Sequence, residues 1–194
     1  MPRGPSASAH KKVLKAALEL IAEQGIEGTS MDAVSRKSGV SKATIYKHWA
    51  NKEALLLEML AEASGLRARP KFDTGDTRAD LAALLAYRPP ENPELRDRIL
   101  PHVIAYSARN RTFGTTWRRM VTDPATRDIR RLVERGMKKG ELQAGLDQEL
   151  AIGLLLGPML YWHIFRKDVE AQEDQRPRAE ALVDAFWRAF AARQ

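Results

Sequence analysis

Residues 29–60 read TSMDAVSRKSGVSKATIYKHWANKEALLLEML, a stretch that predicts two short helices joined by a tight turn and followed by a third helix. In the first helix, Met31 and Val34 are apolar at a spacing of three residues, which suits one buried face. Gly39 ends this helix, because glycine takes the left-handed turn conformation without steric cost. The third helix carries an apolar stripe made of Leu55, Leu56, Met59 and Leu60.

Polar residues that favour helix starts stand before each of these helices. Either Thr29 or Ser30 caps the first helix. The sequence leaves this choice open, although Thr29 has Asp32 three residues on, as in a capping box. Ser41 is expected to cap the second helix and Asn51 the third.

The second helix, residues 42–49, is suited to a DNA major groove. Ile45 and Trp49 lie one turn apart and are expected to point inward. The other faces carry Lys42, Ala43, Thr44, Tyr46, Lys47 and His48. Hydroxyls, a lysine, an imidazole and a phenol on one short helix fit base edges and backbone phosphates. Lys52, in the first turn of the third helix, opposes the helix dipole, and a phosphate beside it would resolve that conflict.

The segment GVSKATIYKHWANKEAL, residues 39–55, resembles the helix-turn-helix of TetR-type transcriptional regulators. The shared pattern is a turn glycine, a small hydroxyl cap, a threonine, Tyr-x-His-aromatic and then Asn-Lys-Glu-Ala-Leu. The match covers the first third of the chain. Ser35 stands where the family usually has alanine, and Trp49 where phenylalanine is usual, but each keeps the physical role of the residue it replaces.

This resemblance implies how the chain would contact DNA. The second helix of each subunit would enter successive major grooves of an operator. Phosphates would be held by Ser30, Tyr46, His48 and Lys52, and base edges would face Lys42, Ala43, Thr44 and Lys47.

The distribution of charge also indicates a nucleic-acid partner. The chain of 194 residues has a net charge of +7, with 32 Lys and Arg against 25 Asp and Glu. Residues 1–52 hold nine basic and four acidic side chains, so +5 of this charge lies in the first 52 residues. A basic surface that only favours solubility is the competing interpretation.

Composition and motifs exclude several classes of site. The chain has no cysteine, so it has no disulfide framework and no thiolate ligands for zinc. The four histidines are far apart in sequence and none has an acidic residue at metal-ligand spacing, so we expect no metal and no cofactor. No motif of a hydrolase or of a phosphate-binding loop is present. The first residues lack the apolar run of a signal peptide, and we expect a cytoplasmic protein.

Helical periodicity continues along the chain and predicts an all-α fold. A first helix is expected over 8–24, ended by Gly25. The polar segment 67–77 contains proline and glycine and is the expected domain boundary. We therefore expect a DNA-binding domain over 8–66, with its helix-turn-helix at about 31–50, and a regulatory and dimerisation domain over 77–194.

Capping and proline signals divide the second half further. Thr77 and Asp80 form a candidate capping box. Asn92 and the proline after it are expected to begin a helix that Pro101 kinks. Pro124 interrupts the next helix, 112–138, and the sequence does not decide whether it kinks or splits that helix.

Residues 150–165, LAIGLLLGPMLYWHIF, contain no charged side chain. The run is short for a membrane span and includes two glycines and a proline, whereas an apolar helix of this length often lies in a core or an oligomer interface. A last helix is expected over 177–193 with Phe186 on its apolar side. In TetR-type regulators the last two long helices usually form a four-helix dimer interface, so the resemblance implies a homodimer.

Two groups of side chains allow more than one interpretation. Five apolar residues either belong to the core or line a pocket for a small apolar or amphipathic effector: Trp117, Met120, Met159, Trp162 and Phe165. A basic run is either a solvated helix face or a site for an anion or DNA: Arg118, Arg119, Arg127, Arg130, Arg131, Arg135, Lys138 and Lys139.

The sequence therefore predicts a dimeric, TetR-like DNA-binding repressor that a small molecule releases from its operator. One alternative is the same DNA-binding fold controlled by a protein partner or left unregulated. The other is a helical enzyme with a basic N-terminal domain.

Overall fold

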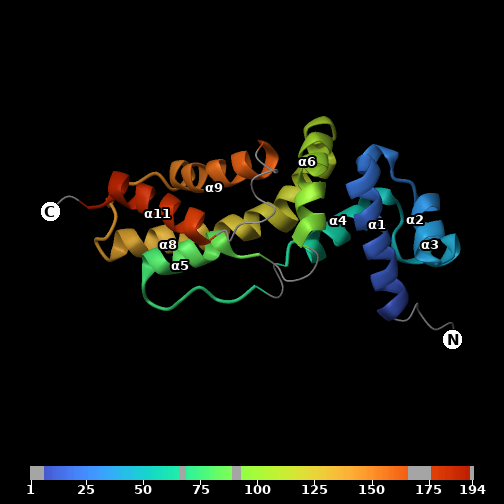
Figure 1. Cartoon of the computed structure of the whole chain (residues 1–194), viewed down its shortest axis with the longest axis horizontal. Coiled ribbons are helices and arrows are strands. Elements are labelled where there is room, and N and C mark those ends of the chain that lie inside the picture. Colours follow the sequence, from blue (N-terminus) through green and yellow to red (C-terminus); the bar gives the residue numbers. More distant parts are fainter. Residues whose placement is uncertain (1–6, 66–68, 89–92, 166–175, 193–194) are drawn as a thin grey trace. The chain divides into compact units, whose positions relative to one another are not determined.

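The computed structural model describes residues 7–65, 69–88, 93–165 and 176–192, which form helices joined by short connections (Figure 1). Within these ranges there is no strand, and one isolated bridge pairs Leu142 with Ala191. The all-α prediction is confirmed. The chain divides into two compact units: unit one consists of residues 1–67 and 89–122, and unit two of residues 68–88 and 123–194.

Unit one contains the N-terminal helices and a second group from the middle of the chain. Its elements are α1 (Ala7–Gly28), α2 (Met31–Ser38), α3 (Lys42–His48), α4 (Lys52–Ala63), α6 (Pro93–Arg109), α7 (Arg111–Trp117) and the π-helix η1 (Arg118–Thr122). They share one core that includes Ile21, Ile45, Leu56 and Phe113. Gly25 has a φ of 76°, so regular helix breaks inside α1 at the predicted residue.

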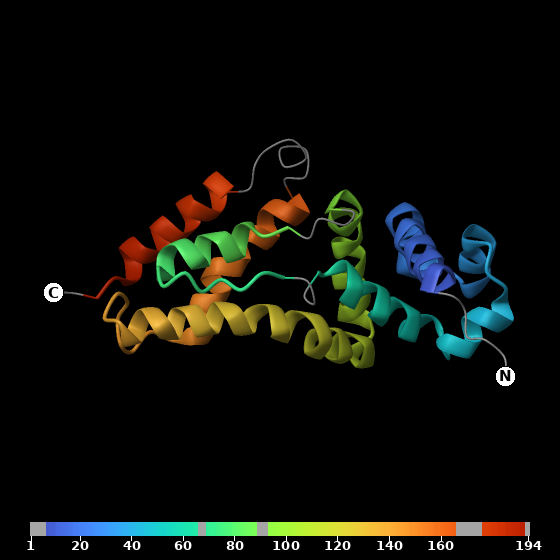
Figure 2. The same ribbon diagram turned by 90° about the horizontal axis from the view of Figure 1, so that it is seen from below.

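Unit two contains α5 (Thr77–Ala86), α8 (Asp123–Lys138), α9 (Gln148–Phe165) and α11 (Arg176–Phe190). Helix α5 packs against both α8 and α11 (Figure 2). A second core fills the space between these helices and includes Leu81, Leu132 and Leu155. Packing places α6, α7 and η1 in the unit that holds the helix-turn-helix. Packing does not define functional domains, so the predicted division of the chain at 66 and 77 stays a prediction.

The predicted capping box at the start of α5 is wrong. Asp76 is the cap, and its carboxylate accepts a hydrogen bond of 2.9 Å from the backbone N–H of Ala79. Thr77 is the first helical residue and is buried. Asp80 turns inward, where it accepts hydrogen bonds from Thr74 and Arg135. The carboxylate of Asp80, predicted to belong to a helix cap, is therefore part of a buried ion pair with Arg135.

The helix that contains Pro124 is neither simply kinked nor split. α7, η1 and α8 follow one another directly, and Pro124 is the second residue of α8. Proline has no N–H, so the carbonyl of Met120 lacks its usual α-helical donor four residues on. The wider π-turns of η1 occur at this place. Helix α6 continues past Pro101. The predicted cap Asn92 lies outside the described residues.

Several basic side chains of the run along α8 have acidic partners that the sequence does not indicate. Acidic side chains from other elements pair with several of its members: Arg130 with Glu149, Arg131 with Asp73, Arg135 with Asp73 and Asp80, and Lys139 with Glu141. Of these pairs, the one between Arg135 and buried Asp80 joins α8 firmly to α5, whereas the others are exposed and contribute little. Sequence spacing along α8 could not reveal partners that come from residues 73, 80 and 149.

Candidate nucleic-acid interface

The start and end of α2 are fixed by short side chains and one glycine. Ser30 is the cap, because its hydroxyl accepts a hydrogen bond of 3.1 Å from the N–H of Ala33. Thr29 instead donates to the carbonyl of Gly25 at 2.8 Å and so closes the end of α1. Gly39 ends α2 with a φ of 68°, as predicted. The turn between α2 and α3 is thereby set by local chemistry.

Helix α3 has one buried face and one exposed face. Ser41 caps it by accepting from the N–H of Thr44 at 3.2 Å, while Ile45 and Trp49 point inward with exposed fractions of 1% and 3%. The burial of Ile45 and Trp49 confirms the prediction that these two side chains point inward. The remaining candidate residues gather on the other faces: Lys42, Ala43, Tyr46, Lys47 and His48 are exposed, and Thr44 is half-buried.

Two of the candidate lysines already have partners within unit one. Lys42 forms an ion pair of 2.6 Å with Asp32 on α2. The ammonium of Lys52 donates a hydrogen bond of 2.9 Å to the carbonyl of Ile26 near the end of α1. This bond offsets the unfavourable interaction between the ammonium and the dipole of α4. No described residue pairs with Lys47. Contacts of these side chains and of exposed Ser30 with DNA stay predictions.

A group of polar side chains at the end of α3 could not be recognised from the sequence. The indole N–H of Trp49 donates to Oε2 of Glu58 at 2.7 Å, and Oε1 of the same carboxylate lies 2.8 Å from Nε2 of His10. The ring of His48 lies beside those of Trp49 and His10, with centroid separations of 5.6 Å and 6.0 Å. The one signal in the sequence is that a buried indole N–H needs an acceptor, but several acidic residues could have served.

The five candidate ligand residues are not brought together within one unit. Trp117 packs against the core of unit one and Met120 is exposed there, whereas Met159, Trp162 and Phe165 lie on α9 of unit two. The guanidinium of Arg178 covers the ring of Trp162 at 5.8 Å, and Phe165 is 68% exposed. Their role in ligand binding stays a prediction.

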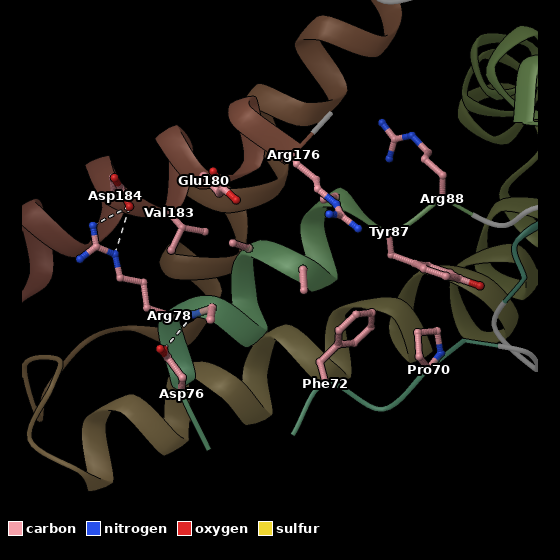
Figure 3. Close-up of a pocket in the computed structure, with 14 residues that line it drawn as sticks. Pro70, Phe72, Asp76, Arg78, Tyr87, Arg88, Arg176, Glu180, Val183 and Asp184 are labelled. Carbon is pink, nitrogen blue, oxygen red and sulfur yellow. Dashed lines mark hydrogen bonds and ion pairs between the residues drawn. The ribbon is translucent and has the colours of Figure 1, made fainter. Parts of the chain in front are cut away.

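Unit two has a groove elsewhere, of about 750 Å³, between α5, the segment before it and α11 (Figure 3). Alanines of α5, Val183 of α11, and Pro70 and Phe72 of the segment before α5 form its apolar part. The ion pair between Arg78 and Asp184 lies at one end, and Tyr87, Arg88 and Arg176 lie at the other. None of the five candidate ligand residues lines this α5–α11 groove.

Helix α9 exposes an apolar stripe along its length. Its members recur at helical spacing and extend from Leu150 and Leu154 to Leu160, Tyr161 and Phe165, with Gly153 and Gly157 between them. Among the described residues, no atom outside the adjoining backbone of α9 lies within 4 Å of a Cβ placed on either glycine. By contrast, Phe186 of α11 is buried within its own unit. The apolar pattern of the last helix does not show whether Phe186 faces a partner, and it packs in the core of unit two instead; a part for α11 in dimerisation stays a prediction.

The described residues contain neither a metal-binding cluster nor a membrane-spanning helix. No group of three or more His, Asp or Glu side chains in the described ranges could hold a metal ion. No helix within those ranges is long and apolar enough to cross a membrane.

Comparison with known proteins gives consistent matches over most of the chain. Residues 13–59 match the family described as bacterial regulatory proteins, tetR family, and residues 72–186 match tetracyclin repressor-like, C-terminal domain. The HTH-type transcriptional regulator YdeS from Bacillus subtilis is 30% identical over 152 residues, or 78% of this chain and 76% of YdeS. The DNA-binding transcriptional repressor TetR from Mycobacteroides abscessus is 29% identical over 148 residues, or 76% of this chain and 77% of that protein. A structure from Saccharomonospora viridis, described as a transcriptional regulator in complex with choline, has a TM-score of 0.72 at 19% identity. The match covers 97% of this chain and 100% of that one.

Proposed function

The chain belongs to the TetR family of bacterial regulatory proteins and is a DNA-binding transcriptional regulator, and we propose that it is a dimeric cytoplasmic repressor that a small molecule releases from operator DNA. The observation that carries this proposal is the two-faced α3. Its apolar face is buried, and its exposed face gathers lysines, an imidazole and a phenol. These groups supply hydrogen-bond donors to phosphates and base edges.

A dimer is supported by the apolar stripe of α9. A run of exposed Leu, Tyr and Phe side chains on one helix face is unfavourable in water, and burying it against a second copy would remove that cost. Gly153 and Gly157 would permit close approach of the partner helix, because no side chain fills the space above them. A two-fold dimer would present two copies of α3 about 34 Å apart, or a multiple of that distance, on an operator with matching half-sites.

Repression and release by an effector are supported by the relatives and by the groove. The related protein from M. abscessus is a repressor, and the similarly folded protein from S. viridis is in complex with choline. In this chain the α5–α11 groove combines an apolar floor with charged groups at both ends. That chemistry suits a small amphipathic molecule.

Coupling requires the effector to favour one conformation over the other. A coupling free energy of about 1–3 kcal/mol would weaken operator binding roughly 5- to 150-fold. Control by a protein partner instead would leave the groove without a ligand.

The test is a titration of small amphipathic compounds followed by both groove occupancy and DNA release. Ala82→Trp should fill the groove while leaving operator affinity unchanged, because Ala82 belongs to unit two and not to α3. A compound that binds wild type and releases DNA, but does neither in Ala82→Trp, would support the proposal. Release that persists unchanged in Ala82→Trp would contradict this placement of the effector.

A further inference from the structure

Helix α3 is too short to fix its own orientation. It has seven residues, and within it only Ile45 is fully buried. Isolated helices of this length are unstable in water, so neighbouring elements must set the direction in which α3 presents its exposed side chains. The contacts at its two ends therefore decide how accurately it meets DNA.

The C-terminal end of α3 is held through Trp49. Its backbone N–H donates to the carbonyl of Ile45 at 3.0 Å, which makes it the cap of the helix. Its ring is 97% buried, and its indole N–H donates to Glu58 of α4 at 2.7 Å. A hydrogen bond to a carboxylate is charge-assisted and strongly directional. A movement of the end of α3 would therefore have to break or bend this bond.

The same carboxylate also reaches α1. Its second oxygen lies 2.8 Å from the imidazole of His10, and the rings of His10 and Trp49 lie 4.8 Å apart between centroids. The side chain of Glu58 keeps 46% of its surface exposed and that of His10 30%, so this is not a costly buried charge. One carboxylate thus joins three helices that share the core of unit one.

We propose that Glu58 is a positioning residue for DNA recognition: it bridges His10 of α1 and Trp49 at the end of α3, and so fixes the angle at which α3 enters the major groove. Glu58 itself need not touch DNA. The neighbouring His48, whose ring packs against Trp49, is placed by the same bridge. The inference goes beyond the proposed repressor function, because it concerns how α3 is held and not which effector or dimer controls it.

A positioning role predicts different effects on two kinds of DNA. Binding to random-sequence duplex depends mainly on charge and tolerates a change in helix angle, whereas base readout requires accurate placement. Glu58→Ala should therefore weaken binding to a duplex selected by the wild-type protein by about tenfold, the scale of one lost charge-assisted hydrogen bond. Binding to random-sequence duplex should change no more than it does in the control.

The matched control is Glu62→Ala. Glu62 lies one turn further along α4, is exposed, and has no side-chain partner among the described residues. Both variants remove one negative charge from the same helix, so a difference between them reports the bridge and not the charge. Trp49→Phe keeps an aromatic ring but removes the N–H donor together with part of the buried indole, so it should lose at least as much selected-duplex affinity as Glu58→Ala.

Two further measurements separate positioning from general stability. Glu58→Gln retains an oxygen acceptor for Trp49 and should return selected-duplex affinity to within about threefold of wild type. The indole N–H of Trp49, assigned by its absence in Trp49→Phe, should be protected from hydrogen exchange in wild type and in Glu58→Gln. It should exchange rapidly in Glu58→Ala.

Equal loss in Glu58→Ala and Glu62→Ala, failure of Glu58→Gln to recover affinity, or a protected indole N–H in Glu58→Ala would overturn the proposal. If the wild-type protein enriched no duplex, the result would contradict the proposed function and not the Glu58 bridge. The exchange measurement would then still decide whether the bridge exists.

Discussion

The ammonium of Lys52 donates a hydrogen bond of 2.9 Å to the backbone carbonyl of Ile26, which fastens the start of α4 to the end of α1. An ammonium has three donors, so this bond leaves two for a phosphate of DNA. Lys52 is half-buried. It can therefore serve the structure of unit one and DNA binding together.

Lys52→Ala is expected to change both properties. Loss of the bond to Ile26 should lower the free energy of unfolding by about 1 kcal/mol. Loss of a phosphate contact should weaken binding to all duplexes and reduce the slope of log affinity against log salt by about one unit. Urea denaturation and gel-shift titrations at several salt concentrations measure the two effects. A normal salt slope in this variant would show that Lys52 has only the structural role.

Asp80 is expected to stabilise the protein in a pH-dependent way. Burial alone would raise the pKa of Asp80, but hydrogen bonds from Arg135 and Thr74 outweigh it and hold the pKa below its ordinary value of 3.8. A depressed carboxyl pKa contributes stability that is fully present above this ordinary, unfolded-state pKa. That stability is lost as the pH falls through the lower, folded pKa.

Asp80→Asn should therefore destabilise unit two at neutral pH by about 1–3 kcal/mol, because Arg135 loses its buried partner and keeps the more exposed Asp73. The difference from wild type should shrink at acid pH, where the wild-type carboxylate also loses its charge. Urea denaturation at pH 7 and in acid gives both values. The exposed cap variant Asp76→Asn is the control, since asparagine also caps helices well. A difference between Asp80→Asn and wild type that stayed constant with pH would contradict this assignment.

The α9 stripe is expected to form the subunit interface. Leu154 is 41% exposed in the single chain and lies in the middle of the stripe. Leu154→Glu would place a charge in an apolar contact and should yield a monomer that has lost operator binding. Met120→Glu, at an exposed apolar residue of unit one, should leave the oligomeric state unchanged. Analytical ultracentrifugation at micromolar concentration measures the oligomeric state of each variant. A wild-type protein that is monomeric there would contradict the predicted α9 interface.

The sequence predicted the local features of the DNA-binding region well. Caps, the turn at Gly39 and the inward positions of Ile45 and Trp49 follow from interactions within a few residues, which sequence spacing reveals. In unit two, Asp147 caps α9 by a similarly local interaction, accepting hydrogen bonds from the N–H groups of Glu149 and Leu150.

Contacts between distant segments were not predictable from spacing. The bridge from His10 to Glu58 spans 48 residues, and the bond from Arg135 to Asp80 spans 55. Several acidic residues had the right chemistry for each bond, and only the packed helices select one. For the same reason, Phe186 had the pattern of an interface residue but lies inside its own unit.

The central claim is that α3 reads DNA sequence, and selection of binding sites from a random duplex library tests it most directly. Wild-type protein should enrich a pseudo-palindromic site with half-sites one helical turn, about 34 Å, or a multiple apart. Lys47→Ala should enrich the same site with one relaxed base pair per half-site, at a cost of about 1–3 kcal/mol. Lys71→Ala, at an exposed lysine of unit two, should enrich the wild-type site unchanged. Failure of the wild-type protein to enrich any site, or an identical site with equal affinity for Lys47→Ala, would contradict the account.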